Sequence, residues 1–334
     1  MPRVAVLLPT RDAARTLGAA VRSILRGTFR DLELVVVDDG STDATPALLE
    51  RLAGRDRRLR VIRGPGEGIA GALQRGLSAC DAPLLARMDA DDVAWPGRLS
   101  KQVAALDGEP ALAAVGARVR LFPGGLVRGG MRRYVDWLNG LVTPALVARD
   151  LFVEAPLVHP AAVIRRGALE AVGGWRDGDF PEDYDLWLRL AAAGGALSNL
   201  PATLLDWRES PGRLTRADPR YALDRHVALK CAALAAGPLA GVGEVALWGA
   251  GETGRAFADA LAREGKRVVA FVEVDRKKVG RIIRGAPVHA YQDVERLRGL
   301  PLLVAVGAPG ARDLIRAELA TRGFVELRDF RCVA

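Results

Sequence analysis

The chain has 334 residues, enough for about two domains, and half of them are apolar, so each domain can bury its own core. The formal net charge is +8, but only five of the 48 basic residues are lysines, and the arginines are spread along the chain. Because no recognition motif or aromatic platform accompanies this charge, the sequence indicates no nucleic acid partner and leaves open only a weak attraction to an anionic membrane face.

Short apolar runs alternate with helical patterns over the first 120 residues. The runs predicted as strands are residues 3–8, 32–37, 59–63 and 82–87, and a helical pattern follows each of the first three. Continuous apolar runs separated by helices are typical of parallel strands that are buried on both faces. The sequence therefore predicts an open α/β sheet, in which ligands bind at the carboxyl ends of the strands.

Polar residues stand where three of these strands end. Pro9 and Thr10 end the first strand, Asp38 and Asp39 end the second, and the sequence MDADD at 88–92 follows the fourth. Because the carboxyl ends of parallel strands meet at one edge of a sheet, we expect these residues to share the functional rim. Asp12 is expected to cap the helix that follows the first strand.

The MDADD stretch is a candidate metal site. Two carboxylates spaced as Asp-x-Asp on a tight loop can share one hard divalent cation, since Mg²⁺ and Mn²⁺ prefer oxygen ligands. A solvated acidic turn is the alternative for an isolated Asp-x-Asp. The position after a buried strand, beside a second acidic strand end, favours a metal site formed by Asp89 and Asp91.

The regular alternation fades between about residues 120 and 230, where the sequence predicts loops and helices. A predicted helix in this part begins with three acids: Glu182, Asp183 and Asp185. Acids at this position favour a helix N-terminus through the macrodipole, and Asp185 is interpreted in this way. Residues 173–175, Gly-Gly-Trp, precede them as a flexible loop with an aromatic surface that could hold a sugar against a carboxylate, so Asp183 is a candidate general base.

The Ala/Gly/Pro-rich residues 232–243 predict a domain boundary, with one domain at 1–237 and a second at 238–334. The second domain contains GAGETG, a G-x-G-x-x-G stretch between a predicted strand and a predicted helix. Its glycines, which would let a phosphate approach the helix N-terminus, are Gly249, Gly251 and Gly254. Glu273 and Asp275 lie near the end of the next strand, where a ribose-binding acid is expected.

The glycine stretch resembles the nucleotide-binding half of Rossmann proteins. This resemblance implies a small Rossmann-like domain with a nucleotide or dinucleotide as its ligand, and docking or sensing is the alternative role. About 90 residues follow Glu244, which leaves no room for a further catalytic domain. Cofactor-dependent redox chemistry is therefore not expected.

Several stretches in the first 215 residues together resemble family 2 glycosyltransferases of the GT-A fold. In chain order they are VAVLLPTRDAARTLGAAVRSIL, LELVVVDDGSTDAT, GIAGALQRGL, ARMDADD, HPAAVIRRGALEAVGGW and PEDYDLWLRLA. The order matches that of the family, which makes the resemblance more specific than any single motif. The fold that it implies is a GT-A type nucleotide-sugar-binding open sheet.

The resemblance implies roles for residues at the nucleotide end of the site. Pro9, Thr10 and Asp12 would line the nucleotide pocket, and Asp39 would hydrogen-bond the base, usually uracil. Arg87 could, like other arginines of this chain, simply be solvated, but its position directly beside the acids favours it for donor binding.

The resemblance also implies how the reaction proceeds. Asp89 would reach the ribose or the metal, Asp91 would hold Mg²⁺ or Mn²⁺ on the diphosphate, and Asp183 would deprotonate the acceptor hydroxyl. A diphosphate leaves more readily when a cation neutralises its charge, and one base on the opposite face then suffices. The outcome would be inversion at the anomeric carbon.

The roles of a few further residues stay open at this point. His159 fits the pattern of the family, but a structural histidine is an equally good interpretation. Arg208 and Arg213 could hold the diphosphate through charge-assisted hydrogen bonds, and in a chain this rich in arginine either could simply be solvated. Arg75 is open for the same reason.

The activity predicted is metal-dependent, inverting transfer of a sugar from a nucleotide-diphosphate sugar, usually a UDP-sugar, to a hydroxyl of a saccharide or lipid-linked acceptor, as in polysaccharide or glycoconjugate synthesis. A sugar-phosphate nucleotidyltransferase is one alternative, but such enzymes open with a glycine-rich G-x-G-T-R loop and this chain opens with LLPTRDAART. A nucleotide-sensing or scaffold protein with an inactive transferase domain is another. The processive synthases of the family that this chain resembles carry a Q-x-x-R-W signature. This sequence does not contain it, which favours transfer of one sugar at a time.

Apolar runs and cysteines bear on where the protein works. None of the apolar runs approaches the roughly 20 residues that cross a bilayer. Cys80, Cys231 and Cys332 are widely separated, which gives neither a metal-ligand spacing nor a disulfide framework. The sequence therefore predicts a soluble, cytoplasmic protein, with association at the inner face of the membrane and oligomer formation both left open.

Overall fold

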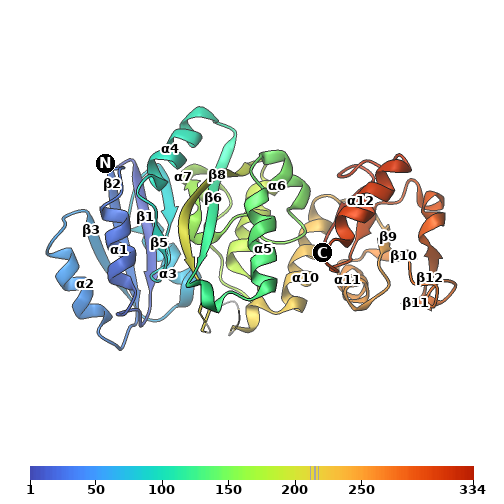
Figure 1. Ribbon diagram of the computed structural model, residues 1–334, viewed down its shortest axis with the longest axis horizontal. Helices are drawn as coiled ribbons and strands as arrows, with labels where there is room; N and C mark the ends of the chain where they lie inside the picture. The colour runs from blue at the N-terminus through green and yellow to red at the C-terminus, as the bar shows by residue number, and fades with distance from the viewer. Residues whose placement is uncertain (211, 214–215, 217) are drawn as a thin grey trace. The chain divides into compact units, whose positions relative to one another are not determined.

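The computed structural model describes residues 1–210, 212–213, 216 and 218–334, and these residues form two compact units. Unit 1 comprises Met1–Ala148, Pro156–Gly178 and Glu182–Ala217, and unit 2 comprises Arg149–Ala155, Asp179–Pro181 and Asp218–Ala334. Each unit contains one open β-sheet with helices beside it (Figure 1).

The sheet of unit 1 has eight strands in the order β3-β2-β1-β4-β7-β6-β8-β5. Their bounds are β1 (Val4–Thr10), β2 (Leu32–Asp39), β3 (Leu59–Gly64), β4 (Leu84–Arg87), β5 (Val93–Ala94), β6 (Leu112–Phe122), β7 (Val163–Arg165) and β8 (Ala196–Arg208). The four strands predicted from the apolar runs are β1 to β4, and they are parallel. Strand β7 is antiparallel to both of its neighbours, and β5 is antiparallel to β8, so the sheet is mixed.

Helices cover both faces of the parallel strands. Those of unit 1 are α1 (Leu17–Leu25), α2 (Thr45–Ala53), α3 (Gly68–Ser78), α4 (Arg98–Gly108), α5 (Gly129–Gly140), α7 (Arg166–Ala171) and α8 (Glu182–Ala192), with short 3₁₀ turns at Gly124–Leu126 and His159–Ala161, and α6 (Pro144–Asp150) leads into unit 2. Because side chains alternate along a strand, Val6 and Leu8 join the core that contains α1 and α4. Leu7 points to the other face, where Gly76 of α3 lets the helix approach: a Cβ there would lie 3.3 Å from Leu7.

Strands β7 and β8 correct the sequence prediction, which expected loops and helices after about residue 120. Strand β8 pairs with β6 over ten register positions in the second half of the sheet. Asn199 and Pro201 interrupt the apolar pattern of β8, and such residues argue against a strand interior. Two features accommodate them: the register shifts between Ala117 and Arg118, and the Asn199 side chain donates to the carbonyls of Leu141 and Pro156 at 3.0 and 2.9 Å.

Unit 2 has a six-stranded sheet in the order β11-β12-β10-β9-β13-β14. Its elements are α10 (Leu223–Ala236), β9 (Glu244–Trp248), α11 (Glu252–Arg263), β10 (Arg267–Glu273), β11 (Ile282–Ile283), β12 (Ala286–Ala290), β13 (Leu302–Val304), α12 (Ala311–Thr321) and β14 (Phe330–Cys332), with 3₁₀ turns at Pro219–Tyr221 and Tyr291–Leu297. All neighbouring strands are parallel except β11 and β12. Unit 2 also contains α10, which precedes the predicted domain boundary at residues 237/238, so this boundary stays a prediction. The Rossmann-like assignment of the second domain also stays a prediction.

Among the helices described in the structure, none is long and apolar enough to cross a membrane.

Candidate active site

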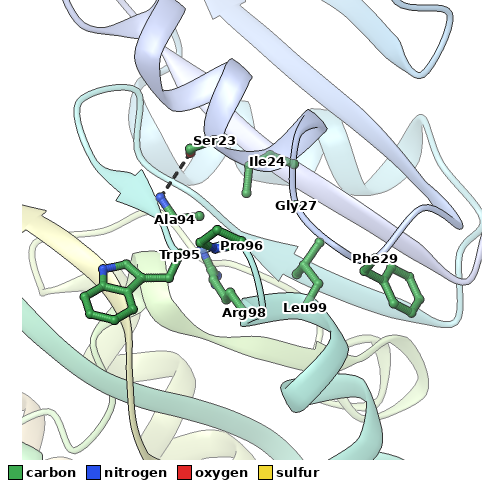
Figure 2. Close-up of a pocket in the computed structure, with 9 residues that line it drawn as sticks. All are labelled: Ser23, Ile24, Gly27, Phe29, Ala94, Trp95, Pro96, Arg98 and Leu99. Atoms are coloured by element: carbon green, nitrogen blue, oxygen red, sulfur yellow. Dashed lines mark hydrogen bonds between the residues drawn. The ribbon is translucent and has the colours of Figure 1, made fainter.

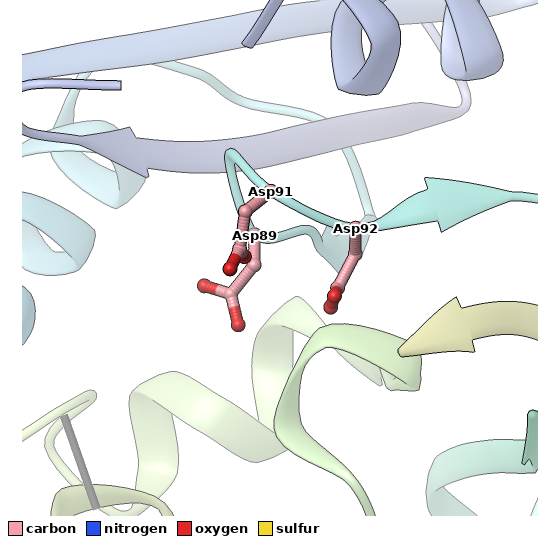
Figure 3. Close-up of side chains that lie close together, drawn as sticks. All are labelled: Asp89, Asp91 and Asp92. Atoms are coloured by element: carbon pink, nitrogen blue, oxygen red, sulfur yellow. The ribbon is translucent and has the colours of Figure 1, made fainter. Parts of the chain in front are cut away.

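The loop that joins β4 to β5 brings three carboxylates together (Figure 3). One carboxylate oxygen from each of Asp89, Asp91 and Asp92 lies within 4.8 Å of the other two. Asp89 and Asp91 are half-buried, with 31% of the Asp89 side chain exposed, whereas Asp92 is 1% exposed. The sequence analysis named Asp89 and Asp91 as metal ligands and missed Asp92, although it is the next acid in the same MDADD stretch.

The crowding of these acids changes their protonation. Burial and, after it, the charge of Asp89 raise the pKa of Asp91 to about 6. Burial also raises the pKa of Asp92 well above its usual range, and the charges of Asp89 and Asp91 add to the effect. Carboxylates this close repel one another unless protons or a cation intervene. An oxygen-rich, negatively charged cluster is what Mg²⁺ and Mn²⁺ prefer, so the residues present fit such an ion.

Asp92 connects this acid loop to strand β8. Its Oδ1 accepts a hydrogen bond from the backbone N–H of Arg208 at 2.7 Å. Its Oδ2 is buried and has no hydrogen-bond partner among the residues that the structure describes. A buried carboxylate oxygen left without a partner is costly, which favours a ligand at this point.

The arginines near the acids already have protein partners. Arg87 is 2% exposed and forms an ion pair with Asp89. The Nε of Arg208 donates to the backbone carbonyl of Asp91 at 2.6 Å, and its guanidinium lies 4.4 Å from the centre of the Phe122 ring. Arg208 therefore fixes the acid loop. Arg213 lies 4.0 Å from the centre of the Trp207 ring. Whether any of these arginines also touches a diphosphate stays a prediction.

The carboxyl ends of β1 and β2 contribute the other predicted site residues at this edge of the sheet. Thr10 is paired in register with Asp38, directly beside Pro9, and is 4% exposed. Its hydroxyl has no partner within the described part of the chain. Asp39 is buried, and its carboxylate accepts hydrogen bonds from three successive backbone N–H groups, those of residues 66–68, at 3.0, 2.9 and 2.7 Å. Asp39 thus holds the loop before α3, and its Oδ2 retains a lone pair for one more donor.

Asp12 has a different role from the helix cap expected from the sequence. The N-cap of α1 is Thr16. Asp12 instead reaches the loop after β2, where its Oδ1 accepts from the backbone N–H groups of Thr42 at 2.7 Å and Asp43 at 3.2 Å. The hydrogen bond from Thr42 is the main cause that lowers the pKa of Asp12. Asp12 is therefore ionised and joins the loops after β1 and β2, while its contact with a nucleotide stays a prediction.

Trp175 does not form the exposed aromatic surface that the sequence analysis expected. It is 5% exposed, and its indole N–H donates to Nε2 of His159 at 2.9 Å. His159 is also buried, and its Nδ1 lies 3.8 Å from Oε1 of Glu182. Burial, with the charge of Arg87, holds the pKa of His159 well below its usual value, so the imidazole is neutral. Asp183, the next residue of α8, is half-buried in the first turn of the helix.

Asp185 is buried as well, which corrects its interpretation as an ordinary charge at a helix end. It is 1% exposed and accepts from Nε of Arg176 at 3.1 Å and Nε of Arg189 at 2.8 Å. Arg189 also donates to the carbonyl of Gly174 at 2.9 Å. The burial of Asp185 could not be predicted from the sequence, because its partners Arg176 and Arg189 are brought together only by the fold. Asp185 therefore ties α8 to the loop before it.

Asp185→Asn is expected to destabilise the protein by about 2–3 kcal/mol, because a buried carboxylate with charged partners would be lost. The matched control is Asp136→Asn on α5, an exposed position, where the change should stay within about 0.5 kcal/mol. Chemical denaturation of both variants measures the difference. Equal unfolding free energies would show that the Asp185 ion pairs do not stabilise the fold.

A hollow lies between α1, β5 and α4 (Figure 2). It is lined by Ser23, Ile24, Gly27, Phe29, Ala94, Trp95, Pro96, Arg98 and Leu99. The Ser23 hydroxyl accepts from the backbone N–H of Ala94 at 3.0 Å across it. Because none of the predicted site residues lines it, this hollow is not a candidate for the donor pocket.

The glycine loop of unit 2 has two glycines that packing requires and one that it does not. Gly249 has φ +112°, and a Cβ there would lie 2.9 Å from the carbonyl oxygen of Ala305. A Cβ at Gly254 would overlap the carbonyl oxygen of Gly249, whereas one at Gly251 would meet no described atom within 4 Å. Glu273, expected near a ribose, accepts from the backbone N–H of Ala250 in this loop at 3.1 Å.

Comparison with known proteins identifies relatives over most of the chain. The profile of the family described as Glycosyl transferase family 2 matches residues 5–173. EpsE of Bacillus subtilis (strain 168), named as a glycosyltransferase, is 29% identical over 231 residues, which cover 68% of this chain and 80% of EpsE. The amylovoran biosynthesis glycosyltransferase AmsE of Erwinia amylovora is 28% identical over 210 residues, covering 61% of this chain and 75% of AmsE.

Solved structures with the same fold are more distant in sequence. TarS 1–349 of S. aureus, in complex with UDP-GlcNAc, has a TM-score of 0.57 and 17% identity, covering 78% of this chain and 72% of that one. The mannosyltransferase PcManGT of Pyrobaculum calidifontis, in complex with GDP-Man and Mn²⁺, has a TM-score of 0.51 and 22% identity, covering 79% and 69%. At these identities the likeness concerns the fold, and it supports the GT-A assignment.

Proposed function

Because this chain belongs to glycosyl transferase family 2 and is therefore a glycosyltransferase, we propose that it moves a sugar from a nucleotide-diphosphate sugar to an acceptor hydroxyl in a metal-dependent, inverting reaction. The donor proposed is a UDP-sugar, and the acceptor is a saccharide or lipid-linked saccharide of polysaccharide or glycoconjugate synthesis. The name of AmsE, which refers to amylovoran biosynthesis, supports a saccharide acceptor. Membership in the family removes the nucleotidyltransferase alternative.

The observation that carries this proposal is the convergence of Asp89, Asp91 and Asp92 at the edge of the parallel strands. Asp89 and Asp91 would hold Mg²⁺ or Mn²⁺, with Asp92 behind them. A bound divalent cation would neutralise charge on the diphosphate leaving group. PcManGT, whose structure contains Mn²⁺ and GDP-Man, supports a cation in a protein of this fold.

The remaining rim residues would bind the nucleotide and act on the acceptor. The buried, unpartnered hydroxyl of Thr10 supports a ligand beside Pro9, and Asp39 has capacity for one donor from the base. Arg87 would hold the Asp89 carboxylate in place through their ion pair. Asp183 would take the proton from the acceptor hydroxyl, as a half-buried carboxylate in the first turn of α8. Each role follows from the family resemblance and the local geometry together.

Titration calorimetry of the full chain against UDP, GDP and a panel of their sugar conjugates, with and without Mn²⁺, tests the proposal. We expect one nucleotide to bind at least about tenfold more tightly with Mn²⁺ than without it, because the cation would join the acids to the diphosphate. Failure of every nucleotide to bind, with or without the ion, would contradict the proposal and support the scaffold alternative with an inactive transferase domain.

For unit 2, we propose a nucleotide-type ligand at the glycine loop, with docking as the alternative. The support is Gly251, the N-cap of α11. Neither packing nor backbone conformation requires a glycine at this position, and its missing side chain leaves open space beside the helix N-terminus. Gly251→Val is expected to weaken binding of NAD or ADP by the full chain more than tenfold, since the side chain would fill the space of a phosphate. The thermal midpoint should not change.

Gly254→Ala is the matched variant for this test. Its added methyl would overlap the Gly249 carbonyl, so it should lower the thermal midpoint by several degrees, as a loss of about 1–3 kcal/mol from overpacking would do. Absence of NAD and ADP binding at millimolar concentration would leave the docking role for this unit.

A further inference from the structure

We propose that His159 and Glu182 are positioning residues for the transfer reaction. Together with Arg87 they form a buried brace, named here the His159 brace, between the acid loop and the first turn of α8. The inference rests on the proposed function, because its effect is on the placement of Asp183. Its three members come from different parts of unit 1: the end of β4, the turn at His159–Ala161 and the start of α8.

The orientation of the imidazole follows from its hydrogen bond to Trp175 and its position beside Glu182. The Trp175 indole can only donate, so Nε2 of His159, at 2.9 Å, must accept. In a neutral imidazole the proton then lies on Nδ1. This N–H faces Oε1 of Glu182 at 3.8 Å. Trp187 of α8 packs edge-on against the ring, with the ring centres 5.9 Å apart. The ring therefore has one defined tautomer and one defined orientation.

The charge of Arg87 couples His159 and Glu182 to the acid loop. The Arg87 side chain is 2% exposed and forms the ion pair with Asp89 two residues later. Nη2 of Arg98, the first residue of α4, donates to the backbone carbonyl of Arg87 at 2.6 Å. Arg87 is thus held by Asp89 and Arg98, and the charge of Glu182 acts on its guanidinium.

The brace sets the rotation of α8 about its axis. Successive residues of an α-helix point about 100° apart, so the inward direction of Glu182 fixes the direction of Asp183. A buried, charged side chain also resists displacement, because moving it away from its partners leaves a charge unpaired in the interior. Misplacing a catalytic group by about 1 Å can cost about 100-fold in rate. His159 and Glu182 therefore act on the reaction through Asp183.

Three substitutions at His159 separate the two ring nitrogens. In His159→Asn the side-chain amide nitrogen takes the place of Nδ1 and keeps an N–H directed at Glu182. In His159→Gln the amide takes the place of Nε2, and in His159→Leu neither contact is made. We expect His159→Leu and His159→Gln to lower kcat about 10- to 100-fold, and His159→Asn to restore most of it. The KM for the donor and the UDP affinity should stay within about twofold.

The controls address folding and general effects of the substitution. The matched control is His289→Leu, a half-buried histidine of β12, for which kcat should not change. Activities are expressed per folded molecule, measured by thermal unfolding in the same buffer. If His159→Leu does not fold, Glu182→Gln replaces it: this variant keeps the shape, removes the charge beside Arg87 and should lower kcat at unchanged UDP affinity.

Nitrogen NMR of the histidine side chains gives a readout that does not depend on turnover. We expect His159 to show the neutral Nδ1–H tautomer at neutral pH, because burial and the charge of Arg87 hold its pKa well below its usual value. The Nε2–H tautomer, or full kcat in both His159→Leu and Glu182→Gln, would overturn the brace. Full activity in Asp183→Asn would overturn the proposed function instead, and the tautomer would still decide the brace.

Discussion

Asp183→Asn is expected to lower kcat by about 10²- to 10⁴-fold, the range typical for loss of a general base. The amide has nearly the same shape as the carboxylate but cannot accept the proton of the acceptor hydroxyl. Because this proton transfer belongs to the transition state, UDP affinity and the KM for the donor should change little. Sugar transfer and calorimetric UDP binding, measured side by side, test both parts.

Two neighbouring acids serve as references for this experiment. Glu182→Gln should lower kcat less than Asp183→Asn, because Glu182 is buried beside His159 and acts through placement. Asp185→Asn should lower stability while leaving kcat per folded molecule nearly unchanged, since its partners are Arg176 and Arg189. Near-normal turnover of Asp183→Asn with an authentic acceptor would contradict the inverting mechanism proposed for this site.

Asp91→Asn is expected to remove most of the enhancement of UDP binding by Mn²⁺, a loss of at least about tenfold in affinity. The amide is neutral and a weaker ligand for a hard cation than a carboxylate. The fold should stay intact, because Asp91 lies on a loop and contributes little to the apolar core. UDP titrations with Mn²⁺ and with EDTA, on the wild type and the variant, measure the difference.

The same titrations have a pH dependence with a defined sign. The pKa of Asp91 is raised to about 6, so below this pH the carboxyl carries a proton that a cation must displace. Cation affinity should therefore rise as the pH increases through about 6 and level off above 7. The exposed-site control Asp136→Asn should keep the wild-type pH profile. Equal metal dependence in wild type and Asp91→Asn would contradict the assignment of Asp91 as a ligand.

The first half of the unit 1 sheet could be predicted because the signal is local. Strands β1 to β4 are continuous apolar runs separated by amphipathic helices, and buried parallel strands require that pattern. Once the strands are in place, the position of the acid loop follows from topology. Strand β8 could not be predicted, since Asn199 and Pro201 contradict strand preferences and their compensation comes from distant carbonyls and a register shift.

The burial of Trp175 and Asp185 in the candidate site could not be predicted for a similar reason. Trp175 after a glycine pair and Asp185 in a first helical turn both have ordinary surface explanations in sequence. Their burial depends on His159 and Arg189, which are 16 and 4 residues away along the chain and are recognisable as partners only in the fold. Asp92 was overlooked because spacing alone gives no reason to prefer a third acid over the Asp-x-Asp pair.

The most direct test of the central claim is the transfer reaction itself, measured with the full chain, a panel of UDP- and GDP-sugars and a set of saccharide acceptors, in Mn²⁺ and in EDTA. Release of nucleoside diphosphate follows turnover, and proton NMR of the product gives its anomeric configuration. We expect turnover with one donor that requires the divalent cation and gives a product of inverted configuration. Undiminished turnover in EDTA, or a product of retained configuration, would contradict the account.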